Sequence, residues 1–240
     1  MKQEARLASV KARTALKPVE SRRTVQDQVY EQLRDALMSG AFQARETFTI
    51  ASLSERFATS HMPVREALRR LAAENALRIA ASGTAFVPDL SLDELDDISR
   101  ARCIIEGATA EIAAANLGPD DMAVLQALIE VHHETGTSGD IVAMAAANRE
   151  FHFHIYAAAQ SPVLISQIEN LWLRSGPYVR FLSDRMADLL RTDYRSDFTR
   201  HHTAMLDALR KGDTAAFRIA VEEDIRATQK LLHDFLGLRE

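Results

Sequence analysis

The segment ATSHMPVREALRRLAAENAL, residues 58–77, carries the strongest local signal in the chain. Its first three residues form a turn, and Ser60 can cap a helix whose first turn holds Pro63, where the missing N–H of proline costs nothing. Asn75 is a suitable end for that helix. The apolar residues in between recur at helical spacing: Val64, Ala67, Leu68 and Leu71. The pattern predicts an amphipathic helix that follows a short turn.

The residues before this segment predict two more helices. Thr24 stands three residues before Asp27 in a capping-box arrangement, and apolar residues at helical spacing continue until Gly40. After a loop, Thr49 can cap a short second helix. The short helix, the three-residue turn and the third helix together make a helix-turn-helix.

The residues after the segment predict a wing. Residues 77–79 and 85–87 are strand-like pieces on either side of Ser82-Gly83, and such a pattern is typical of a two-stranded hairpin. Its tip can reach DNA next to the helix-turn-helix. Pro88-Asp89-Leu90 then forms a short hinge.

The face of the third helix opposite its apolar stripe concentrates cations and hydrogen-bond donors. It carries His61, Met62, Arg65 and Arg69, with Arg70 nearby. A helix fits the major groove of DNA, where an arginine can bond to guanine O6 and N7 together, while Ser60 and the helix start contact phosphate. Solvated arginines on an ordinary surface helix are the alternative. The preceding short helix and turn favour DNA recognition.

The net charge of −5 hides an asymmetry. Residues 1–90 hold 14 Lys and Arg against 10 Asp and Glu, a balance of +4, whereas the remainder holds 15 against 24, a balance of −9. Only the first part favours phosphate. Because seven basic side chains occur by Arg23 and apolar periodicity is weak there, residues 1–22 are expected to form a flexible basic arm.

The composition is that of a soluble globular protein, with 47% hydrophobic and 26% charged residues among 240. No apolar run reaches the roughly 18 residues of a membrane span, and the N-terminus is charged where a signal peptide is apolar. We therefore expect a cytoplasmic protein without a membrane partner. Cys103 is the only cysteine, which excludes a disulfide within the chain and a thiolate metal cluster.

The sequence beyond residue 91 is helical throughout. Ser91 stands three residues before Glu94 in a second capping-box arrangement. Helices are predicted at 92–116, 119–134, 140–159, 163–186, 193–210 and 213–236. The predicted fold class is therefore mostly α: a winged helix-turn-helix at residues 23–88, with a small β-hairpin wing, followed at residues 89–240 by an antiparallel bundle of six or seven helices.

Four side chains of this bundle can converge on a metal. Asn148 and His152 are four positions apart and share a helix face, while His202 and Asp224 come from two later helices. Such nitrogen and oxygen donors suit Zn²⁺, Ni²⁺ or Mn²⁺. The alternative is that these histidines are ordinary surface residues or hydrogen-bonded core residues.

Residues 58–77 and the following RIAASGTAFVPDLS resemble the winged helix-turn-helix of the GntR family of bacterial regulators, and PVREALRRL at 63–71 is the most specific part. In the FadR-type branch the resemblance implies operator contacts from the first helix, from the third helix and from the wing. By position, these are Arg34, Ser60, His61, Arg65 and Gly83. Met62 and Arg69 share the same exposed face and complete our set of DNA-binding residues.

Three departures from the family pattern affect this implication. His61 and Met62 stand where the family usually has Arg-Thr, Ala44-Arg45 replaces a Pro-Gly, and the wing glycine is shifted by one position. Because an imidazole cannot form the bidentate fork of arginine, the first departure predicts an altered or relaxed half-site.

Three stretches of the helical part are similar to the FCD effector domain that accompanies the FadR-type DNA-binding domain: RCIIEGATAEIAA, ANREFHFHIYAAAQSPVL and HHTAMLDALRKGDTAAF. The resemblance covers residues 92–236. Metal-binding members use an Asp-x3-His pair and two later histidines, whose positions here hold Asn148, His152, His202 and Asp224. Because two of these four depart from the family, the resemblance implies a divalent metal with a changed preference among metals.

The FCD resemblance also implies an effector, which is typically a small carboxylate or sugar acid, although some members bind acyl-CoA or no metal. Arg102 occupies the family's Arg-x2-Ile/Leu-Glu position and can grip a carboxylate, or else pair with Glu106. Arg180 and Tyr178 are further candidates for effector binding.

The resulting prediction is a ligand-responsive DNA-binding transcription regulator and not an enzyme. It would bind a near-palindromic operator as a homodimer and respond to a small carboxylate-bearing metabolite. A small metal-dependent hydrolase is one alternative, but in the zinc-protease pattern that begins at His133-Glu134, Thr137 replaces the second histidine. A pure protein-interaction module is another alternative.

Overall fold

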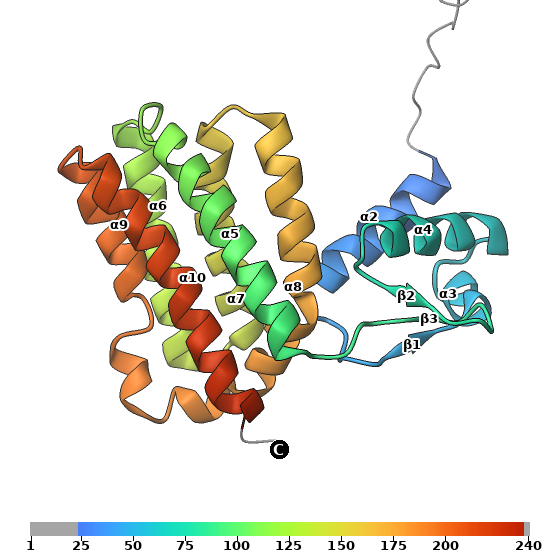
Figure 1. Ribbon diagram of the computed structural model, residues 1–240. Helices are drawn as coiled ribbons and strands as arrows, with labels where there is room; N and C mark the ends of the chain where they lie inside the picture. Colours follow the sequence, from blue (N-terminus) through green and yellow to red (C-terminus); the bar gives the residue numbers. More distant parts are fainter. Residues whose placement is uncertain (1–23, 238–240) are drawn as a thin grey trace, which may run out of the picture.

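The computed structural model describes residues 24–237 (Figure 1). The arm predicted at residues 1–22 lies outside this range. The described chain is mostly helical and forms two adjoining parts, which we call the winged unit (residues 24–87) and the helical bundle (residues 92–237). None of the described helices combines the length and the apolarity that crossing a membrane requires.

The winged unit contains the three predicted helices, α2 (Val25–Met38), α3 (Ile50–Arg56) and α4 (His61–Ala73). The predicted capping box at α2 is confirmed, because the Asp27 N–H donates to the Thr24 hydroxyl and the Asp27 carboxylate accepts from the Thr24 N–H. Ser60 has the predicted N-cap position of α4, but its side chain makes no capping hydrogen bond. The predicted apolar stripe of α4 is fully buried.

The wing is a sheet of three short antiparallel strands rather than a two-stranded hairpin. β2 (Arg78–Ile79) and β3 (Ala85–Phe86) are the predicted pair, and β1 (Thr47–Phe48) adds to the other edge of β3. β1 was not predicted, because two residues are too few to show an alternating pattern. At the tip, Gly83 has φ +84°, a conformation that favours glycine.

The helical bundle has six α-helices: α5 (Leu92–Ala113), α6 (Pro119–Ser138), α7 (Ile141–Ala158), α8 (Pro162–Leu189), α9 (Arg200–Arg210) and α10 (Thr214–Gly237). The prediction of one helix at 193–210 was wrong. A short 3₁₀ helix, η2 (Asp193–Ser196), precedes α9, and Thr192 accepts a hydrogen bond from the Tyr194 N–H at its start. The buried Phe198 lies in the break between η2 and α9.

The two parts touch along α2 and α8, which lie side by side at the junction in Figure 1. A Cβ atom on Gly176 of α8 would lie 2.1 Å from the Leu37 carbonyl oxygen at the end of α2. Only glycine permits this approach. Six residues earlier on α8, the Asn170 amide donates to the Glu74 carbonyl oxygen at 3.2 Å. α8 is therefore in direct contact with both α2 and the C-terminal end of α4.

We expect Gly176→Ala to destabilise the protein, because the added methyl group must displace the backbone of α2. Overpacking of this kind costs about 1–3 kcal/mol of unfolding free energy, which thermal or urea unfolding would measure. Gly237→Ala is the matched control, since a Cβ there meets nothing within 4 Å. Equal stability of the two variants would contradict the close α2–α8 contact.

Candidate functional site

Three polar side chains from three helices converge inside the bundle. His152 of α7, His202 of α9 and Asp224 of α10 offer ligand atoms that all lie within 4.8 Å of one another. The Nε2 atoms of His152 and His202 are 3.3 Å apart, and His152 Nε2 is 3.2 Å from an Asp224 oxygen. Both imidazoles are 1% exposed. We call these three residues the His/Asp cluster.

The other ring nitrogen of each histidine is held by a partner outside the cluster. Tyr156 O–H donates to Glu106 at 2.6 Å, so the Tyr156 oxygen accepts from His152 Nδ1 at 3.2 Å. His202 Nδ1 lies 3.1 Å from His132 Nδ1. With both Nδ1 atoms engaged, both Nε2 atoms face the centre of the cluster. Outer partners of this kind orient histidines that bind metals.

Burial sets the protonation of the cluster. It lowers the pKa of His202 to about 3 and that of His132 to about 4, so both imidazoles are neutral at pH 7. Burial would raise the pKa of the Asp224 carboxyl, but its close approach to His152 and its electrostatic interactions with His202 and His152 lower it below its usual range. Neutral imidazoles beside a carboxylate are in the form that binds a divalent cation.

Arg102, a predicted effector residue, lies next to the cluster. Its guanidinium pairs with the fully buried Glu106 at 2.6 and 3.2 Å, which is the ion pair that the sequence left open as an alternative. The same guanidinium lies 4.7 Å from the centre of the Trp172 ring, and that ring lies 5.7 Å from His152. A continuous set of contacts therefore joins Arg102 to the His/Asp cluster.

Asn148, the fourth predicted metal ligand, lies one turn before His152 on α7 and is half-buried. Within the described residues no hydrogen bond joins its amide to the His/Asp cluster. Asn148 therefore shares the helix face of His152, as predicted from the spacing, without touching the other three ligands.

The other two predicted effector residues lie elsewhere. Tyr178 O–H donates to the Ser91 carbonyl oxygen at 2.8 Å and packs in a small apolar cluster with Leu95 and Phe181. Arg180 pairs with Asp184 at 2.9 Å and touches the winged unit near Gly40. Their contacts place both residues at the junction with the winged unit rather than at the His/Asp cluster.

Sequence reasoning missed His132, Tyr156 and Trp172. A signal for His132 did exist, because it continues the buried stripe of α6 formed by Leu125, Ile129 and Gly136 at helical spacing. Tyr156 is one turn after His152 on α7, and Trp172 is the only tryptophan of the chain. No spacing rule connects α8 to α7, so the proximity of Trp172 could not be predicted.

The second candidate site is the outer face of α4. His61, Met62, Arg65 and Arg69 are all exposed, while the opposite stripe of the helix is buried. Arg69 pairs with Glu66 at 3.0 Å. In the described part of the chain, no hydrogen bond or ion pair engages the Arg65 guanidinium. Ser60 at the start of α4 and Gly83 at the wing tip are exposed as well.

Arg34 is placed differently from the other predicted DNA contacts. Its guanidinium forms a 3.0 Å ion pair with Glu169 of α8, and its side chain is only 20% exposed. Arg34 therefore faces the helical bundle, and contact with DNA would require this ion pair to open.

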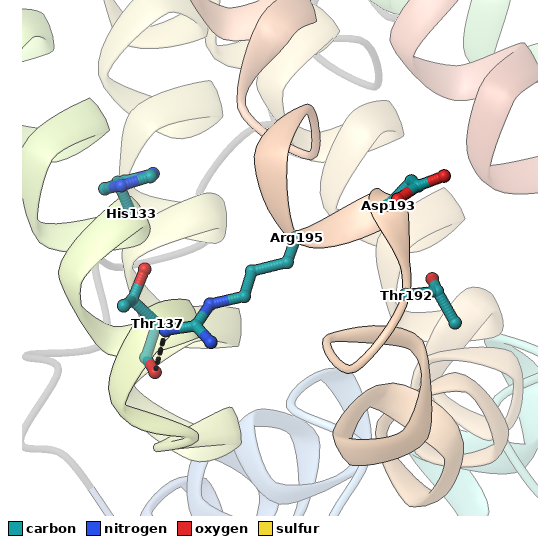
Figure 2. Close-up of a pocket in the computed structure, with 5 residues that line it drawn as sticks. All are labelled: His133, Thr137, Thr192, Asp193 and Arg195. Carbon is teal, nitrogen blue, oxygen red and sulfur yellow. Dashed lines mark hydrogen bonds between the residues drawn. The ribbon is translucent and has the colours of Figure 1, made fainter.

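A separate surface recess of about 410 Å³ contains His133 and Thr137 of α6 (Figure 2). Arg195 extends across it and donates to the Thr137 carbonyl oxygen at 3.5 Å, whereas Asp193 points away from His133. His133 stacks on Phe198 with ring centres 5.7 Å apart. The residues that line this recess do not assemble the hydrolase site considered from the sequence.

Comparison with known proteins gives consistent matches for both parts of the chain. Residues 25–87 match the model of the bacterial regulatory proteins, gntR family, and residues 97–227 match the FCD domain. The HTH-type transcriptional regulator McbR of Escherichia coli is 32% identical over 206 residues, which cover 86% of this chain and 91% of McbR. The Nta operon transcriptional regulator of Aminobacter aminovorans is 25% identical over a region that covers 75% of this chain and 82% of that regulator.

Solved structures agree with these matches. E. coli McbR superposes with a TM-score of 0.81 and 30% identity, over 90% of this chain and 100% of McbR. A GntR transcriptional regulator from Rhodococcus sp. RHA1 superposes with a TM-score of 0.69 and 17% identity, over 86% of this chain and 96% of its own. The latter similarity concerns the fold alone.

We expect acid to destabilise the metal-free protein below pH 6.5. Unfolded histidines take up protons near that pH, whereas the folded pKa values of His202 and His132 are about 3 and about 4. Their contribution to stability is complete above pH 6.5 and declines as pH falls toward the folded values. The loss is about 1.4 kcal/mol per pH unit for each histidine, which urea unfolding with a chelator present would measure.

His132→Asn provides the control for this pH dependence, because it removes one of the two histidines with a lowered pKa. Between pH 6.5 and 5, the slope of the unfolding free energy against pH should fall by about 1.4 kcal/mol per pH unit, which corresponds to one proton. An unchanged slope in this variant would show that His132 is not held neutral by burial.

Proposed function

Because this chain belongs to the GntR family of bacterial regulators and carries an FCD domain, we propose that it binds a near-palindromic operator as a homodimer and responds to a small carboxylate. The chain is a DNA-binding transcription regulator and not an enzyme. We propose the cytoplasm as its location, since that is where bacterial DNA lies.

The observation that carries the operator proposal is the exposed cationic face of α4. The buried stripe fixes the helix against α2 and α3, so Arg65 projects from a rigid support. A homodimer would present two such helices to half-sites about one helical turn of DNA apart. His61 and Met62 lie at the start of the same face and would read the outer bases, with a preference unlike that of an arginine at this position.

We expect Arg65→Ala to weaken specific operator binding by about 1–3 kcal/mol, because a bidentate contact with guanine is lost. The measurement is a titration of operator DNA at fixed salt, followed by anisotropy. Arg191→Ala is the matched control, since it removes the same charge from an exposed position in the helical bundle. Equal affinities of the two variants for the operator would refute the role of Arg65.

We propose that the His/Asp cluster holds a divalent metal, with Zn²⁺, Ni²⁺ and Mn²⁺ as the candidates. The separations of 3.2 and 3.3 Å between ligand atoms fit the roughly 3–3.5 Å between neighbouring ligands around an ion with bonds near 2.1 Å. His152, His202 and Asp224 would supply three ligands, and a rotation of Asn148 could add a fourth. When bound, the metal would supply positive charge that attracts an anionic effector.

The charges around the cluster support a carboxylate effector. Arg102 and Glu106 neutralise each other, and imidazoles that bind a metal are neutral, so Asp224 leaves one net negative charge. A divalent cation would reverse this to one net positive charge in a buried site, where electrostatic interactions are strong. Arg102, next to the cluster, would be a further cationic contact for a bound carboxylate.

The route from effector to DNA would run through α8 and the hinge. The Tyr178 hydroxyl bonds to the backbone of Ser91 at the start of α5, directly after residues 88–90. Glu169 and Asn170, on the preceding turns of α8, bond to the winged unit. A small displacement of α8 would therefore change the orientation of α4 relative to the helical bundle, which is the two-state change that an effector response needs.

We expect the double variant His152→Ala, His202→Ala to lose its bound metal and its ligand response while it keeps its fold. Ni²⁺ quenching of Trp172 emission is a direct measurement, since the ring lies 5.7 Å from His152 and the chain has no second tryptophan. The matched control is the double variant His154→Ala, His233→Ala, whose histidines pair with Asp121 and Asp96 outside the cluster. Undiminished quenching and metal content in the first variant would exclude the site.

A further inference from the structure

The indole N–H of Trp172 is buried and has no hydrogen-bond partner among the described residues. The side chain is 6% exposed. Buried donors in native proteins are almost always paired, so each exception needs an explanation. An unpaired donor in a ligand-binding domain is explained most simply when the ligand supplies the acceptor.

The described residues that lie against Trp172 leave its N–H without an acceptor. Arg102 lies over the ring and has only donors. Both oxygens of Glu106 are already engaged, one by Arg102 and the other by Arg102 and Tyr156. The neighbouring rings of Phe153 and His152 lie at 5.2 and 5.7 Å. The missing acceptor must therefore come from outside the chain.

We propose that the indole N–H of Trp172 donates a hydrogen bond to the hydroxyl oxygen of the effector and thereby selects hydroxy acids over the matching amino acids. The proposal rests on the carboxylate effector proposed above. Arg102 and the indole N–H are both donors, so this side of the site accepts an oxygen and rejects an ammonium group. Trp172 acts as a specificity-determining residue.

The position of Trp172 on α8 gives this bond a second consequence. Gly176, one turn later on the same helix, packs against the Leu37 carbonyl oxygen of the winged unit. A ligand that bonds to Trp172 is therefore bonded to the helix that contacts α2. The selected acids are therefore the ones that alter DNA binding.

Two pairs of acids of nearly equal shape test the selection. Malate and lactate carry a hydroxyl where aspartate and alanine carry an ammonium group. We expect Zn²⁺-loaded protein to bind malate or lactate at least about tenfold more tightly than the matching amino acid, because the amino acid leaves the donor unpaired. Calorimetry measures the four affinities.

Trp172→Phe keeps an aromatic ring, removes the N–H donor and leaves a smaller side chain. In this variant the affinity for the bound hydroxy acid should fall about tenfold, and the preference over its amino acid should shrink accordingly. Tyr30→Phe is the control, since it removes an aromatic donor that bonds to Glu74 in the winged unit.

The wild-type protein supplies a measurement that does not depend on a variant. One tryptophan gives one indole ¹H–¹⁵N resonance, which should move downfield and exchange more slowly with water when malate or lactate binds, but not with alanine. One outcome would contradict only the role of Trp172: a hydroxy acid binds, the indole resonance of the wild-type protein does not move, and Trp172→Phe binds that acid as tightly as the wild type does. The proposal of a carboxylate effector would then stand. If neither hydroxy acid binds, the effector class and this inference both fail, while the Arg65 experiment is unaffected.

Discussion

An ionised carboxylate in the interior of the helical bundle constrains the rest of the structure. Asp224 needs partners that compensate for its removal from water, and His152 and His202 supply them from two other helices. Each histidine in turn needs a partner for its second nitrogen, which brings in Tyr156 and His132. The core of the bundle is thus organised around polar contacts that must be satisfied together.

The same helices connect this core to the winged unit. α8 brings Trp172 next to His152 and, one turn later, Gly176 against Leu37. Because packed interfaces change between discrete arrangements rather than deform gradually, a ligand in the bundle can act on α2 without a long series of small shifts. The Arg34–Glu169 ion pair adds a charge interaction to this interface, and it engages an arginine that the family pattern assigns to DNA.

The features predicted correctly from the sequence are those that depend on residues close together in the chain. The capping box of Thr24 and Asp27 needs only four residues, and the buried stripe of α4 needs only helical spacing. Asp224 was named from the sequence as an oxygen donor on a later helix, and the family resemblance pointed to the same position. β1 was too short to give a pattern, and the break between η2 and α9 depends on the packing of Phe198. Tyr178 and Arg180 were assigned to the effector from position alone, whereas their contacts with Ser91 and Asp184 depend on how α8 is rotated.

The third strand of the wing affects how an operator can vary. β1 lies immediately before α3 and pairs with β3, so the hairpin is joined to the helix-turn-helix at both ends. The wing tip at Gly83 and the exposed face of α4 therefore move as one body. In the operator binding that we propose, a half-site contacted by both α4 and the wing tip would keep a constant number of base pairs between the two contacts. Insertions or deletions of single base pairs would then be tolerated only between the two half-sites.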